Sequence, residues 1–138
     1  MAIPAVAPPV VPGESAAGVA APAQDAALLD SLRRMGIVSA DQPVRLVALA
    51  GGVSSDIYRV ELPDRTICVK RALARLKVAA DWRAPVERNR WEVEWMRVAA
   101  GIVPPAVPTV LGEDRDAGCF AMAYLAPDDH PVWKTLLA

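Results

Sequence analysis

The chain has 138 residues, 54% of them hydrophobic, and its formal net charge is −1. That length suits one small domain, and the near-zero charge gives no electrostatic reason to expect binding to nucleic acid or to an anionic membrane. No apolar run reaches the roughly 18 residues that a membrane helix needs. No Lys or Arg precedes Arg33, although a secretory leader would begin with one. We therefore expect a cytoplasmic protein without a membrane partner.

The residue types that bind metals are scarce. His130 is the one histidine, and the two cysteines, Cys68 and Cys119, are far apart with no CxxC spacing. We therefore expect no metal site. Both cysteines lie in apolar stretches, which favours buried, reduced thiols.

The N-terminal part divides into a tail and a helix. Residues 1–24 are rich in alanine and proline, and we expect them to form a disordered tail. Asp25 is a candidate N-cap for the helix that follows, and Gly36 is a natural stop. Four apolar residues fall at helical spacing between them: Leu28, Leu29, Leu32 and Met35.

Three strands are predicted next, over residues 44–50, 57–62 and 66–71. Glycines and serines separate the first two strands, and the tight turn "LPDRT" separates the second from the third. Short strands joined by turns predict an antiparallel meander.

The C-terminal part predicts a long helix and two more strands. Pro85 suits the first turn of a helix that runs to about Ala100, and Gly101 with two later prolines ends it. Strands are expected at residues 109–111 and 119–125, joined by the turn "GEDRDAG". The predicted fold is α+β, a five-stranded antiparallel sheet with one long helix packed on it.

The turn "GGVSSD" is a candidate anion site. Glycines between two strands let backbone N–H groups point inward, and serine hydroxyls add donors. The segment matches neither GxxxxGK[ST] nor GxGxxG before a helix, because a strand follows it. An ordinary β-turn is the competing interpretation. The candidate phosphate-binding residues here are Gly51, Gly52, Val53, Ser54 and Ser55.

Lys70 lies in the third strand, within "TICVKRAL". Strand alternation places Ile67 and Val69 on one face, and Cys68 and Lys70 on the other. If the first face packs under the long helix, Lys70 points into a cleft beneath the glycine turn, where an ammonium can meet the phosphates of a nucleotide. A lysine that extends along the sheet edge toward solvent is the alternative.

The long helix offers three carboxylates as partners for Lys70: Glu87, Glu92 and Glu94. An apolar stripe formed by Trp91, Trp95, Val98 and Ala99 is expected to face the sheet. Glu92 lies about 60° from the centre of that stripe, so it can reach inward while the helix stays packed. We therefore favour Glu92, with Glu94 second. Glu94 can instead pair with Arg90 or Arg97, and all three glutamates can be solvated helix charges.

Taken together, these segments resemble a known family. The stretches "LAGGVSSDIYRVEL", "ICVKRAL", "RWEVEWMRVAA", "VPTVLGED" and "CFAMAYL" look like the N-terminal lobe of the aminoglycoside phosphotransferase and choline kinase-like family, small-molecule kinases with a protein-kinase-like fold. The resemblance covers about residues 25–130. It implies a kinase-like lobe at 25–127, with 128–138 as the start of a connection to a second lobe.

The resemblance also implies residue roles. Gly51, Gly52 and Ser54 would lie over the ATP phosphates, and Lys70 would bind them while paired with Glu92. At the other end of the nucleotide, Tyr58 would stack on the adenine and Met122 would lie at the back of its pocket. The carbonyl of Ala123 and the N–H of Leu125 would hydrogen-bond the adenine edge. A buried strand is the competing interpretation of Met122 and Leu125.

The chain departs from the family at the catalytic residues. The family's catalytic aspartate follows a His-Gly motif in the second lobe, whereas His130 here precedes a proline and Asp128 and Asp129 suit a polar loop. We therefore expect a lobe truncated before the catalytic loop, inactive alone, with Mg²⁺ bound only when the second lobe is present. The acceptor, a small hydroxyl compound, is not identifiable. The alternative is a non-catalytic module that binds a nucleotide or a protein partner, or an α+β domain in which these residues are only structural.

Overall fold

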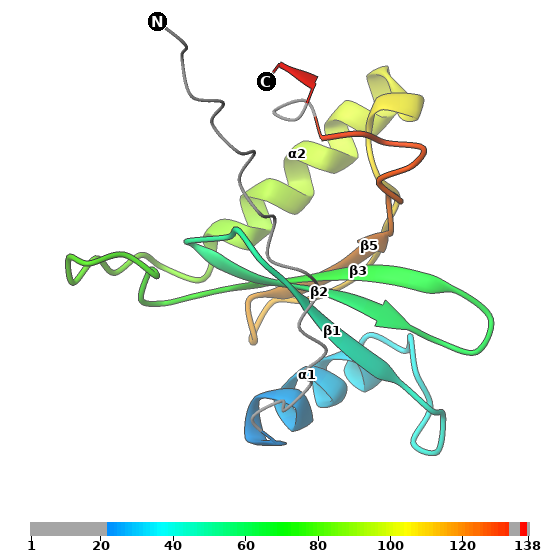
Figure 1. Ribbon diagram of the computed structural model, residues 1–138, viewed down its shortest axis with the longest axis horizontal. Coiled ribbons are helices and arrows are strands. Elements are labelled where there is room, and N and C mark those ends of the chain that lie inside the picture. Colours follow the sequence, from blue (N-terminus) through cyan, green and yellow to red (C-terminus); the bar gives the residue numbers. More distant parts are fainter. Residues whose placement is uncertain (1–21, 133–135, 138) are drawn as a thin grey trace, which may run out of the picture.

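The computed structural model describes residues 22–132, 136 and 137, and its fold is α+β. The elements in chain order are α1 (Pro22–Arg34), β1 (Arg45–Leu49), β2 (Ser55–Glu61), β3 (Thr66–Ala72), α2 (Arg88–Ile102), the 3₁₀ turn η1 (Pro104–Ala106), β4 (Val110–Asp114) and β5 (Cys119–Ala123). The strands form one antiparallel sheet in the order β1-β2-β3-β5-β4 (Figure 1). The predicted fold class and five-stranded antiparallel sheet are confirmed.

The ends of several elements differ from the prediction. α1 begins at Pro22, so Asp25 lies inside the helix and is not its N-cap. Proline suits a first helical position because its missing N–H needs no partner there. β2 begins at Ser55, inside the predicted turn, and α2 begins at Arg88, three residues after Pro85. Of the predicted tail, residues 1–21 lie outside the described part of the chain.

The two helices lie on opposite sides of the sheet (Figure 1). The core forms on the α1 side, where Leu28 and Leu32 are buried against Val60 and Val69. Ile67 and Val69 therefore pack under α1, so the condition that they pack under the long helix is not met. Side chains alternate along a strand, so Lys70 points to the α2 side.

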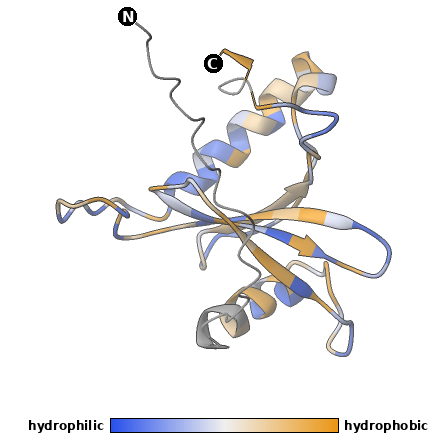
Figure 2. Cartoon of the chain, in the orientation of Figure 1, coloured by the Kyte–Doolittle hydropathy of each residue, from blue (hydrophilic) through white to orange (hydrophobic). Residues whose placement is uncertain are grey.

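The rotation of α2 about its axis also differs from the prediction. Trp91 and Trp95 are 68% and 69% exposed, so the apolar stripe faces away from the sheet. Val93 and Asn89 are buried instead. Polar contacts along the buried side explain this rotation, because the Asn89 side chain donates to the carbonyl of Gly118 and Glu92 meets Lys70. Figure 2 shows that α2 is mostly hydrophilic in its N-terminal half and more hydrophobic toward its C-terminal end.

Neither described helix has the length and apolar character needed to cross a lipid bilayer.

Candidate functional site

Lys70 and Glu92 form an ion pair on the α2 side of the sheet. The Lys70 ammonium lies 2.6 and 2.8 Å from the two carboxylate oxygens of Glu92. The two side chains are 21% and 40% exposed. Lys70 lies opposite Ile57 of β2 and Phe120 of β5, and Phe120 is fully buried. The lysine is therefore held over the middle of the sheet, and the alternative of a solvent-directed edge lysine is wrong.

The other two candidate glutamates do not contact Lys70. Glu94 accepts hydrogen bonds from Arg97 at 3.0 Å and from Arg115 at 3.4 Å. Both arginines also approach Glu113, so this network links α2 to the β4–β5 hairpin. Glu87 is exposed at the N-terminal end of α2. The choice of Glu92 as the partner of Lys70 is confirmed, and so is the contact of Glu94 with Arg97.

The turn between β1 and β2 requires both of its glycines. Gly51 has a φ of 108°, a region that L side chains rarely adopt. A Cβ added at Gly52 would lie 2.6 Å from the backbone oxygen of Ser55. Ser55 pairs with Ala72, two residues beyond Lys70, so the turn begins about 7 Å farther along the sheet than the lysine. The turn and the ammonium therefore lie near the same end of the sheet.

The backbone of this turn is anchored to the segment that follows β3. The N–H of Leu73 donates to the carbonyl of Ser54 at 3.0 Å, and the N–H of Lys77 donates to that of Val53 at 2.7 Å. The two carbonyls point into these contacts, and the Val53 side chain is 52% exposed. Ser55 is only 4% exposed, so its hydroxyl does not lie on the open surface of the turn. A hydroxyl that donates a hydrogen bond to a bound phosphate would have to lie there.

Arg88 connects the turn to α2, a role that the sequence reasoning missed. Its guanidinium donates to the carbonyls of Leu73 at 2.8 Å and Pro85 at 2.7 Å, and also to those of Ser54 and Ala84. An arginine in the first turn of a helix is electrostatically unfavourable, because that end carries partial positive charge. That position was the one sequence signal for a special role of Arg88.

Tyr58 lies on the α1 side of the sheet, opposite to Lys70. It pairs with Val69, is 8% exposed, and its ring lies 5.9 Å from the Arg71 guanidinium. A base bound near Lys70 would be separated from Tyr58 by the sheet. Stacking of Tyr58 on adenine therefore does not fit a nucleotide bound on the Lys70 face, because strand alternation points neighbouring side chains to opposite faces.

Asp56 shares the face of Tyr58 and binds two cations. Its carboxylate accepts hydrogen bonds from Lys77 at 2.7 Å and from Arg71 at 2.9 Å. Burial alone would raise the pKa of Asp56, but the hydrogen bonds from these two cations hold it below its ordinary value. Asp56 thus ties β2 to β3 and to the loop after β3.

At the other end of the Lys70 face, Met122 lies opposite Cys68 and Val110. The N–H of Ala123 donates to the carbonyl of Thr109 at 2.8 Å. Leu125 follows the end of β5 and is 44% exposed. Met122 therefore faces the same side as Lys70, which is the side the expected adenine pocket requires.

Arg59 is the cross-strand neighbour of Cys68 on this face, and the sequence reasoning did not select it. Its guanidinium lies 3.0 Å from Glu61, and its Nε is buried without a partner among the described residues. A hydrogen bond with Tyr124 raises the pKa of Arg59. Arg59 therefore lies beside Cys68 on the face that also carries Met122.

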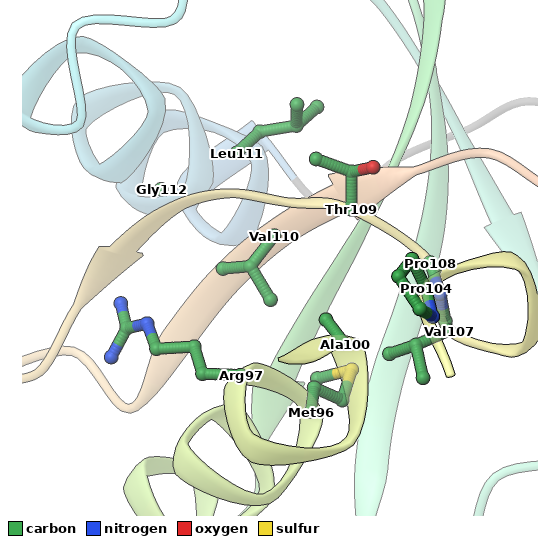
Figure 3. Close-up of a pocket in the computed structure, with 10 residues that line it drawn as sticks. All are labelled: Met96, Arg97, Ala100, Pro104, Val107, Pro108, Thr109, Val110, Leu111 and Gly112. Atoms are coloured by element: carbon green, nitrogen blue, oxygen red, sulfur yellow. The ribbon is translucent and has the colours of Figure 1, made fainter. Parts of the chain in front are cut away.

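Two pockets border α2 in the described part of the chain, and neither is lined by Lys70 or the glycine turn. One, of about 410 Å³, lies between α2 and β4, with Met96 and Ala100 facing Val110 (Figure 3). The other, of about 420 Å³, lies between the N-terminal end of α2 and the β4–β5 turn.

The two cysteines are free and buried, as predicted. Burial raises the pKa of the Cys68 thiol, and burial followed by the nearby Asp114 charge raises the pKa of Cys119 to about 12. Among the described residues, no three His, Cys, Asp or Glu side chains come together in a group that could hold a metal ion.

No protein-family description matches this chain, and no curated protein matches it significantly.

Proposed function

We propose that residues 25–127 form the nucleotide-binding lobe of a phosphotransferase that moves the γ-phosphate of ATP to a hydroxyl of a small molecule. The observation that carries the proposal is the Lys70–Glu92 ion pair, at 2.6 and 2.8 Å, on the sheet face next to the glycine turn. In protein kinases a lysine on the third strand pairs with a glutamate of the following helix, under a glycine-rich loop. Lys70 lies on β3, and Glu92 lies on the helix that follows it.

In this proposal Lys70 neutralises the phosphates and Glu92 keeps its ammonium in place. Gly51 and Gly52 allow the turn to approach the phosphates closely, and Ser54 lies at its end.

The base would lie over the opposite end of the same face. Met122 would line the back of its site, and the Ala123 carbonyl and Leu125 N–H would bind its edge. In this proposal Arg59, and not Tyr58, stacks on the base, because a guanidinium can stack on an aromatic ring. Tyr124 and Glu61 hold Arg59 in this position.

The described residues supply a binding lobe without a catalytic group. Phosphoryl transfer needs an aspartate that orients the acceptor hydroxyl and ligands that hold Mg²⁺. Asp128 and Asp129 lie in an exposed turn whose backbone folds back on Ala126, as in a polar loop. The proposal therefore assigns the acceptor site and the Mg²⁺ site to a second lobe. It also places the protein in the cytoplasm, where ATP is available.

The second candidate function is a binding module without catalysis, which recognises a nucleotide or a protein partner. The exposed apolar surface of α2 favours it, because Trp91 and Trp95 are both more than two-thirds exposed.

Calorimetric titration of the 138-residue chain with ATP, with and without Mg²⁺, tests the proposal. We expect saturable binding that weakens at least about tenfold in Lys70→Met, because a charge contact to the phosphates is lost. Glu92→Gln should weaken binding less, and Glu94→Gln, on the same helix, should leave it unchanged. Equal affinity of the wild type and Lys70→Met for ATP, or no ATP binding at millimolar concentration, would refute the proposal.

A further inference from the structure

The outer face of α2 carries a continuous apolar stripe that nothing in the described chain covers. It consists of Trp91, Trp95, Val98 and Ile102, which are 68%, 69%, 56% and 74% exposed. Single exposed apolar residues are ordinary on protein surfaces, whereas a contiguous group of this size marks an interaction site. The stripe lies on the helix side that does not contact the sheet, and it is separate from the nucleotide face.

The spacing of the stripe is that of a helix–helix seam. Successive members are 4, 3 and 4 residues apart in the sequence. This alternation is the a/d pattern of a coiled coil, in which such side chains insert between those of a second helix. The spacing therefore favours a helix as the partner, rather than an extended peptide or a flat surface.

The distribution of charge along α2 favours a second copy of the same helix in antiparallel orientation. The N-terminal half carries Arg90, Glu92 and Glu94, while residues 98–103 carry no charge. Figure 2 shows the accompanying rise in hydrophobicity toward the C-terminal end of α2. An antiparallel pair places each charged half beside an uncharged half. A parallel pair would place Arg90 beside its own copy, and like charges in contact are unfavourable.

The same orientation matches large side chains with small ones. When two copies of α2 cross between residues 96 and 97, Trp91 of one chain meets Ile102 of the other, and Trp95 meets Val98. These are a–d layers of an antiparallel coiled coil. Both ends of the stripe are then covered by equivalent contacts, as two-fold symmetry requires.

The area of the stripe suits a small interface. Aromatic side chains bury about 150–250 Å² each, so Trp91 and Trp95 at their observed exposure offer on the order of 100–170 Å² apiece. With Val98, Ile102 and the flanking side chains, each copy approaches the roughly 600 Å² per partner at the lower end of specific interfaces.

We propose that two copies of this chain associate through an antiparallel pair of α2 helices, with the Trp91–Ile102 stripe as the seam. This inference does not depend on nucleotide binding. Association through the outer face of α2 does not require Glu92 to move, because Glu92 lies beside the seam and keeps its contact with Lys70.

Sedimentation equilibrium of the full chain up to about 200 µM tests association, since interfaces at the low end of the size range are weak and need high concentration to be populated. We expect the mass to rise with concentration toward twice 14.7 kDa. Trp95→Glu should remain a monomer at every concentration. The matched control is Trp82→Glu, because Trp82 is 61% exposed but lies outside α2, and this variant should associate like the wild type. A monomeric wild type, or a dimer that persists in folded Trp95→Glu, would overturn the proposal.

Disulfide trapping tests the orientation. Trp91→Cys and Ile102→Cys chains are mixed and oxidised, and the native thiols do not compete because Cys68 and Cys119 are buried. An antiparallel pair should give several-fold more mixed disulfide than either like-with-like product. Predominant like-with-like disulfides would show a parallel pair and contradict the antiparallel arrangement, as would the absence of any cross-link at concentrations where the wild type is dimeric.

Discussion

The Lys70 ammonium lies between the two carboxylate oxygens of Glu92, a residue 22 positions later in the chain. Water reaches both side chains, which are 21% and 40% exposed. Partly exposed ion pairs of this kind contribute about 0–1 kcal/mol to stability. The contact therefore contributes little to the stability of the fold. This fits the proposal that the pair serves to position the Lys70 ammonium on the sheet face.

We predict that Lys70→Met changes the free energy of unfolding by less than about 1 kcal/mol. The measurement is urea denaturation of the wild type, Lys70→Met, Glu92→Gln and the double variant, from which the coupling energy of the pair follows. A coupling energy above about 2 kcal/mol would mean that the pair is a structural support.

The sheet was predictable because it follows from short-range rules, whereas the choice of Glu92 was right although the apolar stripe used to select it faces away from the sheet. Period-two alternation fixes which side chains share a face, so the sequence alone places Lys70 and Val69 on opposite faces of the strand. The Gly51–Gly52 turn was equally visible, since its backbone conformation requires glycine.

The features that the sequence did not reveal depend on contacts between distant elements. The rotation of α2 follows from Asn89 meeting Gly118 and Glu92 meeting Lys70, and an apolar stripe alone cannot reveal such contacts. The side of Tyr58 depends on the register between β2 and β3, which places Tyr58 opposite Val69 and which alternation within a single strand cannot give.

The glycine turn gives a sharp comparison between two positions. Gly52→Ala should destabilise the chain by about 1–3 kcal/mol, because the new Cβ would overlap the Ser55 backbone oxygen at 2.6 Å. Gly101→Ala is the matched control, since nothing lies within 4 Å of a Cβ there, and it should stabilise the chain by about 0.5 kcal/mol through helix propensity. Thermal unfolding of both variants measures the difference, and equal midpoints would contradict the backbone geometry of the turn.

Arg88 should matter more for stability than any other charge at the start of α2. Arg88→Met removes the donors that satisfy the carbonyls of Leu73 and Pro85, and we expect a loss of about 1–3 kcal/mol. Arg90→Met is the control, because Arg90 is exposed and its guanidinium lies 5.5 Å from the Trp91 ring, a contact worth about 0.5–1 kcal/mol. Denaturant titrations that rank Arg90→Met as the more damaging change would show that the Arg88 contacts are not formed.

Asp114 should make the stability of the chain fall in acid. Its carboxylate accepts hydrogen bonds from the Arg34 guanidinium at 3.0 and 2.7 Å, across 80 residues, and it is 7% exposed. Burial alone would raise the pKa of Asp114, but hydrogen bonds from Ser31 and Arg34 hold it below its ordinary value of 3.8.

Because that pKa is lowered by folding, the stabilising contribution is complete above about pH 4, the ordinary value of an aspartate, and is lost as the pH falls through the folded-state pKa. We predict that the free energy of unfolding, measured by urea titration between pH 7 and pH 2, decreases below pH 4. In Asp114→Asn this decrease should be smaller, and the variant should already be less stable at pH 7 by about 1–3 kcal/mol, since the Ala117 N–H and Arg34 lose a charged acceptor. Part of the acid sensitivity should remain, because the pKa of Asp56 is lowered in the same direction. A pH profile of Asp114→Asn parallel to that of the wild type would show that Asp114 has the same pKa in the folded and unfolded chains. That result would contradict the hydrogen bonds from Arg34 and Ser31.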